Sequence, residues 1–369
     1  MRTEPRQQTG GERGEPEGGI GAGGDGRWPG VPPAGGPGMS VATATVRCLI
    51  VGRMPKPDLD LVRLKAGLDG LELVEAPSGE APPDEHFDCV WRLFGGRLAN
   101  EEVDPLQRAL SQHPEVRWVH TVSAGVDHLD EIMAPHPDVI LTNSAGVVAV
   151  PIAEFVVGCL LHHCKRFAEI RTLQASARWE SLQLRELGDL RVVIVGFGAI
   201  GRELARRLGP FGCRLTAVRR HPEAGGAGLV TDLFAPEQLV AACDGADALV
   251  LAAPLTRETR GLISREALAV LHDGACLINI ARGGLVEDSE LLEALGTGPL
   301  RAAYLDAFEE EPLPPTSPLW SAAGIHVSPH ISWSSPNFSR RTSELFAEQL
   351  RRFAMGEQLR NRVDLAAGY

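Results

Sequence analysis

The sequence has only three lysines, two tyrosines and five methionines, and it lacks both a basic block and a long apolar run. Lys56, Lys65 and Lys165 are the lysines, so the 36 basic residues are nearly all arginines, scattered along the chain. With a formal net charge of -12, this distribution argues against a nucleic-acid-binding surface. Glu154 interrupts the apolar stretch 148–161, which falls short of the roughly 18 residues of a membrane span. We therefore expect neither a nucleic acid nor a membrane as partner.

Cysteine is present, but not in the patterns that bind metals or build disulfide frameworks. The seven cysteines include no C-x-x-C pair and no metal-ligand spacing, and their number is odd. We interpret them as small core residues and expect no metal site. An odd number of cysteines without an export signal is typical of the reducing cytoplasm, so we expect a cytoplasmic protein that acts on a small molecule.

Aliphatic side chains are scarce in residues 1–38, which are rich in Gly, Pro, Glu and Arg. We expect this segment to be a disordered tail, and it lacks the apolar region of a signal peptide. The preference for arginine over lysine indicates a GC-rich coding sequence, in which upstream DNA readily reads as Gly, Pro, Ala and Arg. We therefore interpret Met39 as the natural start and residues 1–38 as a dispensable or artefactual extension.

From Thr45 onward, short aliphatic runs alternate with helical segments, a pattern typical of parallel sheets covered by helices. The pattern predicts a first series of strands at 46–51, 71–74, 89–93, 117–121 and 139–142. It predicts a second series at 192–195, 215–218, 248–252, 276–280, 302–306 and 326–328. We expect one long helix over 151–173 and an amphipathic helix over 339–355. The fold class predicted is α/β, with two doubly wound parallel-sheet domains.

A strand, a glycine-rich turn and a helix follow one another at residues 192–208. Gly196, Gly198 and Gly201 form the pattern G-x-G-x-x-G. In this pattern the first glycine permits a tight turn, the second lets the backbone approach a pyrophosphate, and the third lets helix and strand pack closely. The helix N-terminus supplies free N–H groups to the phosphates. A nicotinamide dinucleotide is therefore the leading cofactor hypothesis.

Three ionisable residues follow strands of the second series, at the sheet edge where ligands of such folds bind. Arg282, Glu311 and His330 have the chemistry that hydride transfer to a ketone requires. The arginine can hold a carboxylate or carbonyl, the histidine can donate a proton, and a nearby carboxylate would raise the pKa of that histidine. Taken singly, Arg282 could cap a helix, Glu311 could lie in a solvated turn, and His330 could be an ordinary loop histidine.

The motifs in combination resemble those of the D-isomer-specific 2-hydroxyacid dehydrogenases, over about residues 46–369. The segments that carry the resemblance are 123–127 (SAGVD), 143–146 (NSAG), 195–201 (VGFGAIG), 253–256 (APLT), 279–283 (NIARG), 306–312 (DAFEEEP) and 328–330 (SPH). Their order and spacing are far more specific than the glycine pattern alone.

The resemblance implies a role for each catalytic candidate. Arg282 would bind and polarise a 2-oxo acid, His330 would give the proton during reduction, and Glu311 would orient and charge that histidine. Substrate contacts would come from Arg92 and from backbone amides around Ala124 and Gly125, although Arg92 could equally be an exposed loop residue. Cofactor contacts would come from Gly196, Phe197, Gly198, Ala199, Ile200, Gly201, Arg219, Arg220, Ala253, Pro254, Thr256, Ala281 and Asp306.

Two positions depart from the family pattern. Arg219, followed by Arg220, stands where NAD-dependent members have an Asp for the ribose 2′-hydroxyl. Because a guanidinium would pair with a 2′-phosphate, we predict that NADP is favoured among NAD(P) cofactors, unless both arginines merely flank a surface turn. Trp333, three residues past His330, stands where many relatives carry a small residue. It would shape the pocket for a larger or flatter substrate, or pack between domains.

The resemblance also implies an architecture and an assembly. A Rossmann cofactor domain, 143–331, would be inserted into a flavodoxin-like substrate domain, 46–142 plus 332–369, with the cleft between them closing to exclude water. We expect a homodimer joined through the long helix near Pro151, and a glyoxylate- or hydroxypyruvate-like substrate. The main alternative is an NAD(H)-sensing, corepressor-like interaction protein on the same fold, and an enzyme acting on formate or phosphite is less favoured.

Overall fold

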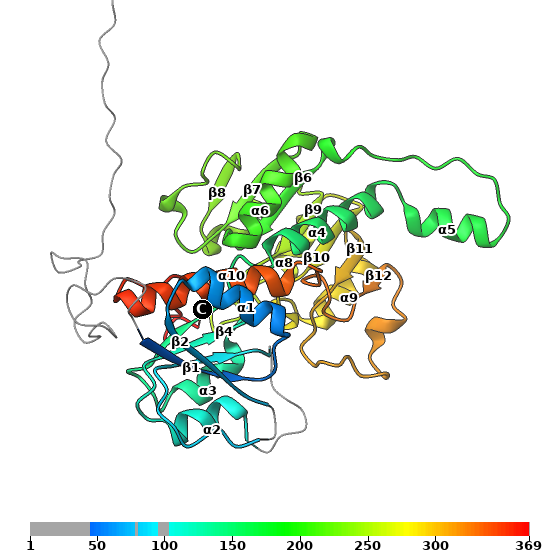
Figure 1. Ribbon diagram of the computed structural model, residues 1–369. Coiled ribbons are helices and arrows are strands. Elements are labelled where there is room, and N and C mark those ends of the chain that lie inside the picture. Colours follow the sequence, from blue (N-terminus) through cyan, green and yellow to red (C-terminus); the bar gives the residue numbers. More distant parts are fainter. Residues whose placement is uncertain (1–44, 78–79, 95–102, 369) are drawn as a thin grey trace, which may run out of the picture.

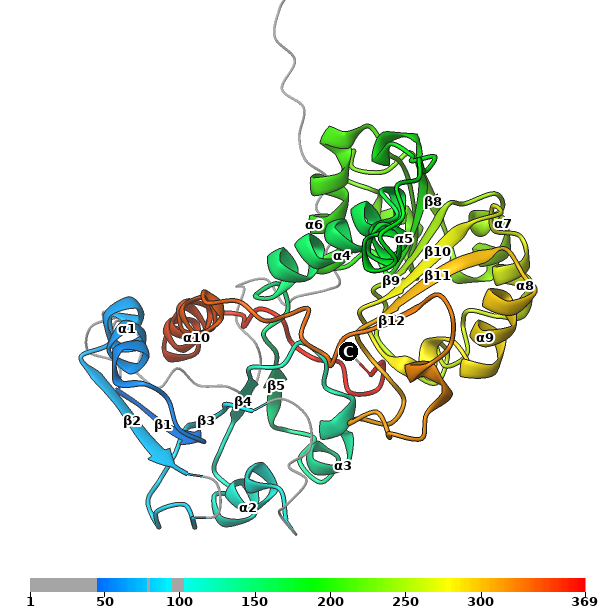
Figure 2. The same cartoon turned by 90° about the vertical axis from the view of Figure 1, so that its right-hand side faces the viewer.

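The computed structural model describes residues 45–77, 80–94 and 103–368, and the expected tail 1–38 lies outside them. Within this part of the chain, two parallel β-sheets are flanked by helices, so the predicted α/β fold class is confirmed (Figure 1). In the views of Figures 1 and 2 each sheet and its flanking helices form a separate unit, which we call a layer, and the two layers meet near the C-terminus. No described helix is both long and apolar enough to cross a membrane.

The first sheet has the strand order β2-β1-β3-β4-β5, the order of flavodoxin-like folds. Helix α10 packs along α1, so the end of the chain returns to the first sheet (Figure 2). The stacked rings of Trp91 and Phe346, with centroids 3.9 Å apart, fasten α10 to the sheet. The elements are β1 (Thr45–Val51), α1 (Lys56–Ala66), β2 (Gly70–Ala76), β3 (Cys89–Arg92), α2 (Pro105–Gln112), β4 (Trp118–Thr121), α3 (Asp130–Met133), β5 (Ile140–Thr142) and α10 (Phe338–Met355).

The second sheet has the order β12-β11-β10-β9-β6-β7-β8, the classical dinucleotide-binding order extended by one strand. All of its pairings are parallel, and its apolar strands are covered on both faces. The strands are β6 (Arg191–Val195), β7 (Arg214–Val218), β8 (Asp232–Phe234), β9 (Ala248–Leu251), β10 (Ala275–Asn279), β11 (Leu300–Leu305) and β12 (Ile325–Val327). The helices are α4 (Ala149–Cys164), α5 (Phe167–Ala175), α6 (Ala199–Leu208), α7 (Leu239–Cys243), α8 (Arg265–Ala269) and α9 (Asp288–Gly296).

Two details of this sheet differ from the sequence-based prediction. The strand β8 was not expected, because it begins with Asp232, a residue type that is disfavoured in strands. The single helix expected over 151–173 is wrong, since the chain forms α4 and α5 with a break at Lys165 and Arg166. Arg166 has the left-handed backbone angle φ 52°, which ends one helix and redirects the next.

The connection between the layers is fastened by a pair of asparagines. The side-chain amide of Asn361 donates to the backbone carbonyl oxygens of Asn143 (3.2 Å) and Ala145 (3.0 Å). In return, the backbone N–H of Asn143 donates to the backbone carbonyl oxygen of Asn361 (3.1 Å). Residues 143–145 follow β5, the last strand of the first sheet, and lead toward α4 beside the second sheet. The asparagine pair therefore ties the C-terminal segment to this crossing.

Candidate active site

The glycine turn after β6 has the geometry that a dinucleotide requires. Gly196 has φ 99°, and a Cβ there would stand 2.5 Å from the backbone of Ala252 and Ala253. A Cβ on Gly201 would stand 2.3 Å from the carbonyl oxygen of Gly196. At Gly198, nothing lies within 4 Å of the Cβ position, so the backbone is open to an approaching phosphate. Because this opening faces the start of α6, whose N–H groups bind anions, the turn fits a pyrophosphate.

The remaining cofactor candidates surround this turn with different local roles. Ala199 and Ile200 begin α6, whereas the Phe197 side chain is buried in the core beside it. On the neighbouring loop, the carbonyl of Pro254 accepts a hydrogen bond from Thr259, and the hydroxyl of Thr256 bonds to Glu258. These loop contacts preform the 253–256 stretch next to Gly196.

Arg219 and Arg220 directly follow the carboxyl end of β7. The Arg219 guanidinium donates to the carbonyl of Gly225 (3.2 Å), and Arg220 pairs with the exposed Glu258 (2.8 Å). Both cations thus lie at the ligand-binding edge of the sheet, next to the strand that delivers the glycine turn. The pairing with Glu258 links Arg220 to the 253–258 loop.

His330 and Glu311 form a hydrogen-bonded pair. The His330 Nδ1 lies 2.8 Å from Glu311 Oε2, and both side chains are partly exposed. The second oxygen of Glu311 accepts the amide N–H of Phe308 at 2.9 Å. Burial raises the pKa of Glu311, but the hydrogen bonds from His330 and Phe308 and the charge of Arg282 outweigh it and lower the pKa. Glu311 is therefore an anion that fixes the imidazole through Nδ1, which leaves Nε2 for proton transfer.

Arg282 follows β10 and reaches across to the first layer. Its Nη2 and Nε lie 3.0 and 3.3 Å from Asp127 Oδ1, and its Nη1 donates to the carbonyl of Ala281 at 2.9 Å. Burial raises the pKa of Asp127, and the charge and hydrogen bonds of Arg282 more than offset it, so the net pKa is lowered. A Cβ on Gly125 would stand 1.8 Å from Nη2, so the guanidinium occupies the space that glycine leaves.

Close backbone packing brings Arg282 to the Glu311 segment. A Cβ on Gly283 would stand 2.1 Å from the amide nitrogen of Glu309 and 2.2 Å from the carbonyl carbon of Phe308. Only glycine permits this contact after Arg282. The predicted trio, Arg282, Glu311 and His330, is thus gathered at one edge of the second sheet, where Arg282 also contacts Asp127.

The loop that carries His330 is held by Asp306, at the end of β11. The Asp306 carboxylate is buried and accepts hydrogen bonds from the Ser328 hydroxyl (2.6 Å) and from the amides of Ile331 and Ser332 (2.9 Å each). His330 itself has φ 54°, a conformation that non-glycine residues rarely adopt without support. The sequence predicted a cofactor contact for Asp306, whereas in the structure both of its carboxylate oxygens bind the 328–332 loop.

Arg92 lies at the end of β3 with its side chain buried, which excludes the alternative of an exposed loop arginine. It pairs with Asp104 at 3.1 Å, and its Nη1 lies 3.1 Å from His128 Nε2. Burial, reinforced by the charge of Arg92, lowers the pKa of His128 to about 4. His128 is therefore neutral, with Nε2 as the acceptor, and the residue next to it in the chain is Asp127.

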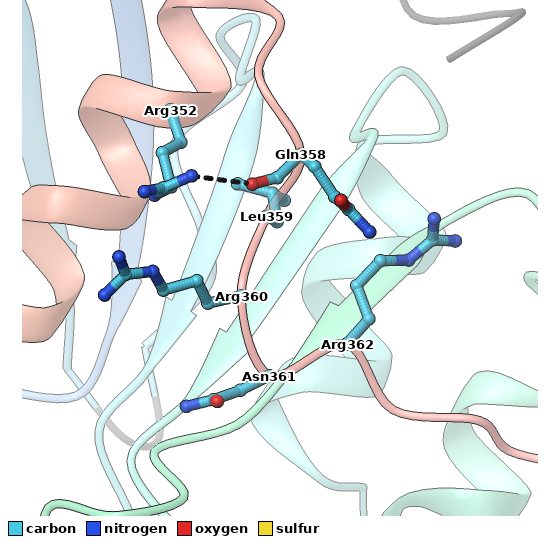
Figure 3. Close-up of a pocket in the computed structure, with 6 residues that line it drawn as sticks. All are labelled: Arg352, Gln358, Leu359, Arg360, Asn361 and Arg362. Atoms are coloured by element: carbon cyan, nitrogen blue, oxygen red, sulfur yellow. Dashed lines mark hydrogen bonds between the residues drawn. The ribbon is translucent and has the colours of Figure 1, made fainter. Parts of the chain in front are cut away.

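A separate cavity of about 610 Å³ lies away from these groups (Figure 3). It is lined by Arg352, Gln358, Leu359, Arg360, Asn361 and Arg362, and Arg352 donates to the Gln358 carbonyl across its wall. None of the catalytic or cofactor candidates lines it, so we do not assign it to the reaction. Within the described residues, no group of His, Cys, Asp and Glu side chains could hold a metal ion.

Comparisons with known proteins point to one family. Residues 157–332 match the family model described as D-isomer specific 2-hydroxyacid dehydrogenase, NAD binding domain. Glyoxylate/hydroxypyruvate reductase A of Klebsiella pneumoniae is 30% identical over 280 residues, which cover 72% of this chain and 88% of the relative. The chain belongs to the D-isomer specific 2-hydroxyacid dehydrogenase family. It is an NAD(P)-dependent oxidoreductase of that family.

Two further members of the family show the extent of the similarity. A D-isomer specific 2-hydroxyacid dehydrogenase from Xanthobacter autotrophicus, solved with NADPH and MES, superposes with a TM-score of 0.77 at 29% identity, covering 88% of this dehydrogenase and all of that chain. The D-3-phosphoglycerate dehydrogenase of Methanocaldococcus jannaschii is 29% identical over 258 residues, 68% of this dehydrogenase but 48% of the relative. This dehydrogenase therefore spans about half the length of that relative.

The role of Asp127 was not predicted from the sequence. The residue lay in the SAGVD motif that supported the resemblance, but its contact with Arg282 joins positions 155 residues apart in two layers. The sequence carries no local signal for such a contact, because it joins two segments that are distant along the chain.

Proposed function

We propose that this dehydrogenase reduces the 2-oxo group of a small 2-oxo acid to a D-2-hydroxy acid, and that glyoxylate- and hydroxypyruvate-like acids are among its substrates. The observation that carries the proposal is the His330–Glu311 pair beside Arg282, at the edge of the sheet that also presents the glycine turn. The similarity to a glyoxylate/hydroxypyruvate reductase supports the substrate class.

In this proposal each residue of the trio has one task. Arg282 binds the substrate carboxylate and polarises the ketone, because a guanidinium forms paired hydrogen bonds to such oxygens. Amides at Ala124 and Gly125 would complete the carboxylate site, and Arg92 would support it through its contact with His128, which is next to Asp127 in the chain. A nicotinamide cofactor held at the glycine turn would supply a hydride. The His330 Nε2 gives its proton to the carbonyl oxygen, so one hydride and one proton yield the hydroxy acid, and Glu311 stabilises the charged imidazole before the transfer.

The two layers would act as domains that close around the substrate. We propose 46–142 plus 332–369 as the substrate domain and 143–331 as the cofactor domain. The Asp127–Arg282 pair, with one partner from each, supports this division. Closure over the site would exclude water before the hydride moves.

We further propose a homodimer. Helix α5 has no buried residue, and Phe167, Ile170, Trp179 and Leu184 are exposed on it or on the segment that follows. In Figure 1 this region extends away from both sheets. It is nevertheless held in place, since Glu169 pairs with Arg301 of β11 at 2.5 Å. A fixed, exposed apolar surface of this kind is suited to a second copy of the chain.

The unpaired cysteines support a reducing compartment, so we propose the cytoplasm as the location of this dehydrogenase.

The test of the proposed reaction follows NADPH and NADH oxidation with a panel of 2-oxo acids. We expect turnover in the wild type and a loss of kcat/KM of about a hundred-fold or more in Arg282→Lys and His330→Gln. Arg265→Lys is the matched control, because this exposed arginine pairs with Glu293 away from the site. Absence of turnover with every 2-oxo acid, while NADPH still binds, would refute the proposed reaction and favour a cofactor-sensing role.

A further inference from the structure

Trp333 is a large apolar side chain fixed beside the proposed proton donor. Its indole Nε1–H donates to the carbonyl oxygen of His330 at 2.8 Å, which ties the ring to the backbone of the donor residue. The side chain is nevertheless 40% exposed. Ile331, next to His330, is 49% exposed. A tryptophan held by its polar atom, with much of its ring left uncovered, offers an apolar contact surface at the site.

The ring is placed toward the carboxyl ends of the first sheet. Trp333 contacts Phe338 at the start of α10, with ring centroids 5.1 Å apart at an angle of 60°. Phe338 packs on the buried cluster beneath α10, and Ser343, farther along the same helix, contacts Met54, which follows the carboxyl end of β1. Because ligands of open parallel sheets bind outside the carboxyl ends of strands, this apolar wall borders the region where substrate would enter.

The polar groups of the site leave one part of a 2-oxo acid without a partner. Arg282 and the amides near Gly125 account for the carboxylate and carbonyl, and His330 accounts for the proton. The substituent on C3 must then face other side chains. We propose that Trp333 is a specificity-determining residue that receives a flat, apolar C3 substituent, so that 2-oxo acids with an aryl side chain are preferred. This inference rests on the proposed 2-oxo acid reduction.

The experiment compares kcat/KM for phenylpyruvate with that for glyoxylate in the wild type and three variants. The wild type should prefer phenylpyruvate by about ten-fold or more, the scale expected when a large apolar group gains a partner surface. Trp333→Ala should reduce this ratio about ten-fold. Trp333→Phe keeps an aromatic ring but loses the bond to His330, so it should lower both kcat/KM values together and keep most of the ratio.

Trp320→Phe is the matched control. Trp320 is 53% exposed, and its Nε1 also donates to a backbone carbonyl, that of Pro314 at 2.9 Å, but it lies on the loop before β12. Trp320→Phe should leave kcat/KM unchanged for both phenylpyruvate and glyoxylate. A ratio that favours glyoxylate, or one that Trp333→Ala leaves unchanged, would overturn the inference while turnover itself upholds the proposed function. Absence of turnover with all 2-oxo acids would overturn both this inference and the proposed function.

Discussion

The Nη2 atom of Arg282 lies 1.8 Å from the point where residue 125 would carry a Cβ if it were not glycine. The catalytic guanidinium we propose is therefore seated directly on the backbone of the facing layer. Asp127, two residues along, holds the same guanidinium through a single carboxylate oxygen. The position of Arg282 is thus determined by the absence of one side chain and the presence of another.

We expect Gly125→Ala to displace Arg282 and lower kcat/KM for 2-oxo acids about a hundred-fold, the cost typical of a misplacement near 1 Å. The affinity for NADPH, measured by fluorescence titration, should change little. Gly296→Ala is the control, because nothing lies within 4 Å of its Cβ position at the end of α9. Full activity of Gly125→Ala would show that Arg282 has another working position.

The Asp306 carboxylate should act on the reaction through the His330 loop. Asp306→Asn replaces one acceptor oxygen by an NH₂ group that cannot accept the amide of Ile331 or Ser332. We expect kcat to fall ten-fold or more with the Kd for NADPH within about two-fold of wild type. If the Kd rises more than kcat falls, Asp306 is instead the cofactor contact that the family resemblance implies.

Charge at the end of β7 should decide between the two cofactors. We expect Arg219→Asp to reduce kcat/KM for NADPH about ten- to hundred-fold while leaving the value for NADH within a few-fold, because the 2′-phosphate loses a cationic partner. Arg214→Asp makes the same charge change at the opposite end of β7 and should alter neither value. A wild type with higher kcat/KM for NADH would contradict the proposed NADP preference.

The buried histidine of β4, His120, predicts how stability depends on pH. His120 is fully buried, its ring nitrogens lie 2.8 and 3.2 Å from the hydroxyls of Thr142 and Ser144, and desolvation lowers its pKa to about 3. Below pH 6.5 the unfolded chain binds a proton at this site and the native chain does not. The contribution of His120 to the free energy of unfolding is complete above about pH 6.5. It is lost as the pH falls toward 3, with a slope of about 1.4 kcal/mol per pH unit.

Urea unfolding between pH 7.5 and 5 measures this slope. His120→Asn should make the free energy of unfolding fall less steeply as the pH is lowered. His221→Asn, at an exposed site, should leave this pH dependence unchanged. An equal slope in wild type and His120→Asn would mean that other groups control acid stability.

The exposed apolar arm, formed by α5 and the segment up to Leu184, predicts a homodimer. Ile170→Glu should convert a dimer into a monomer in light scattering, because a charge would be buried without a partner at the proposed interface. Leu64→Glu is the control, since Leu64 is 77% exposed on α1, far from the arm in sequence. A wild type that is monomeric at all concentrations would refute the dimer.

The sequence predicted those parts of the site that follow strands. The glycine turn, Arg282 and His330 were found because parallel strands bring their carboxyl ends to one edge, so position along the chain translates into position in space. Contacts between layers have no such signal. The Asp127–Arg282 pair and the burial of Arg92 depend on how two sheets face each other, and the break at Arg166 depends on one backbone angle.

The asparagine pair at the crossing between the layers has a consequence for how such an enzyme can change over time. Asn143 and Asn361 bind each other where the chain passes from one sheet to the next, while Asp127 and Arg282 meet across the gap that this crossing spans. Any substitution that alters the angle of this crossing also changes how the Arg282 guanidinium lies against Gly125 and Asp127. If Arg282 binds the substrate as we propose, substitutions at the crossing alone would change turnover, with every proposed substrate contact left in place.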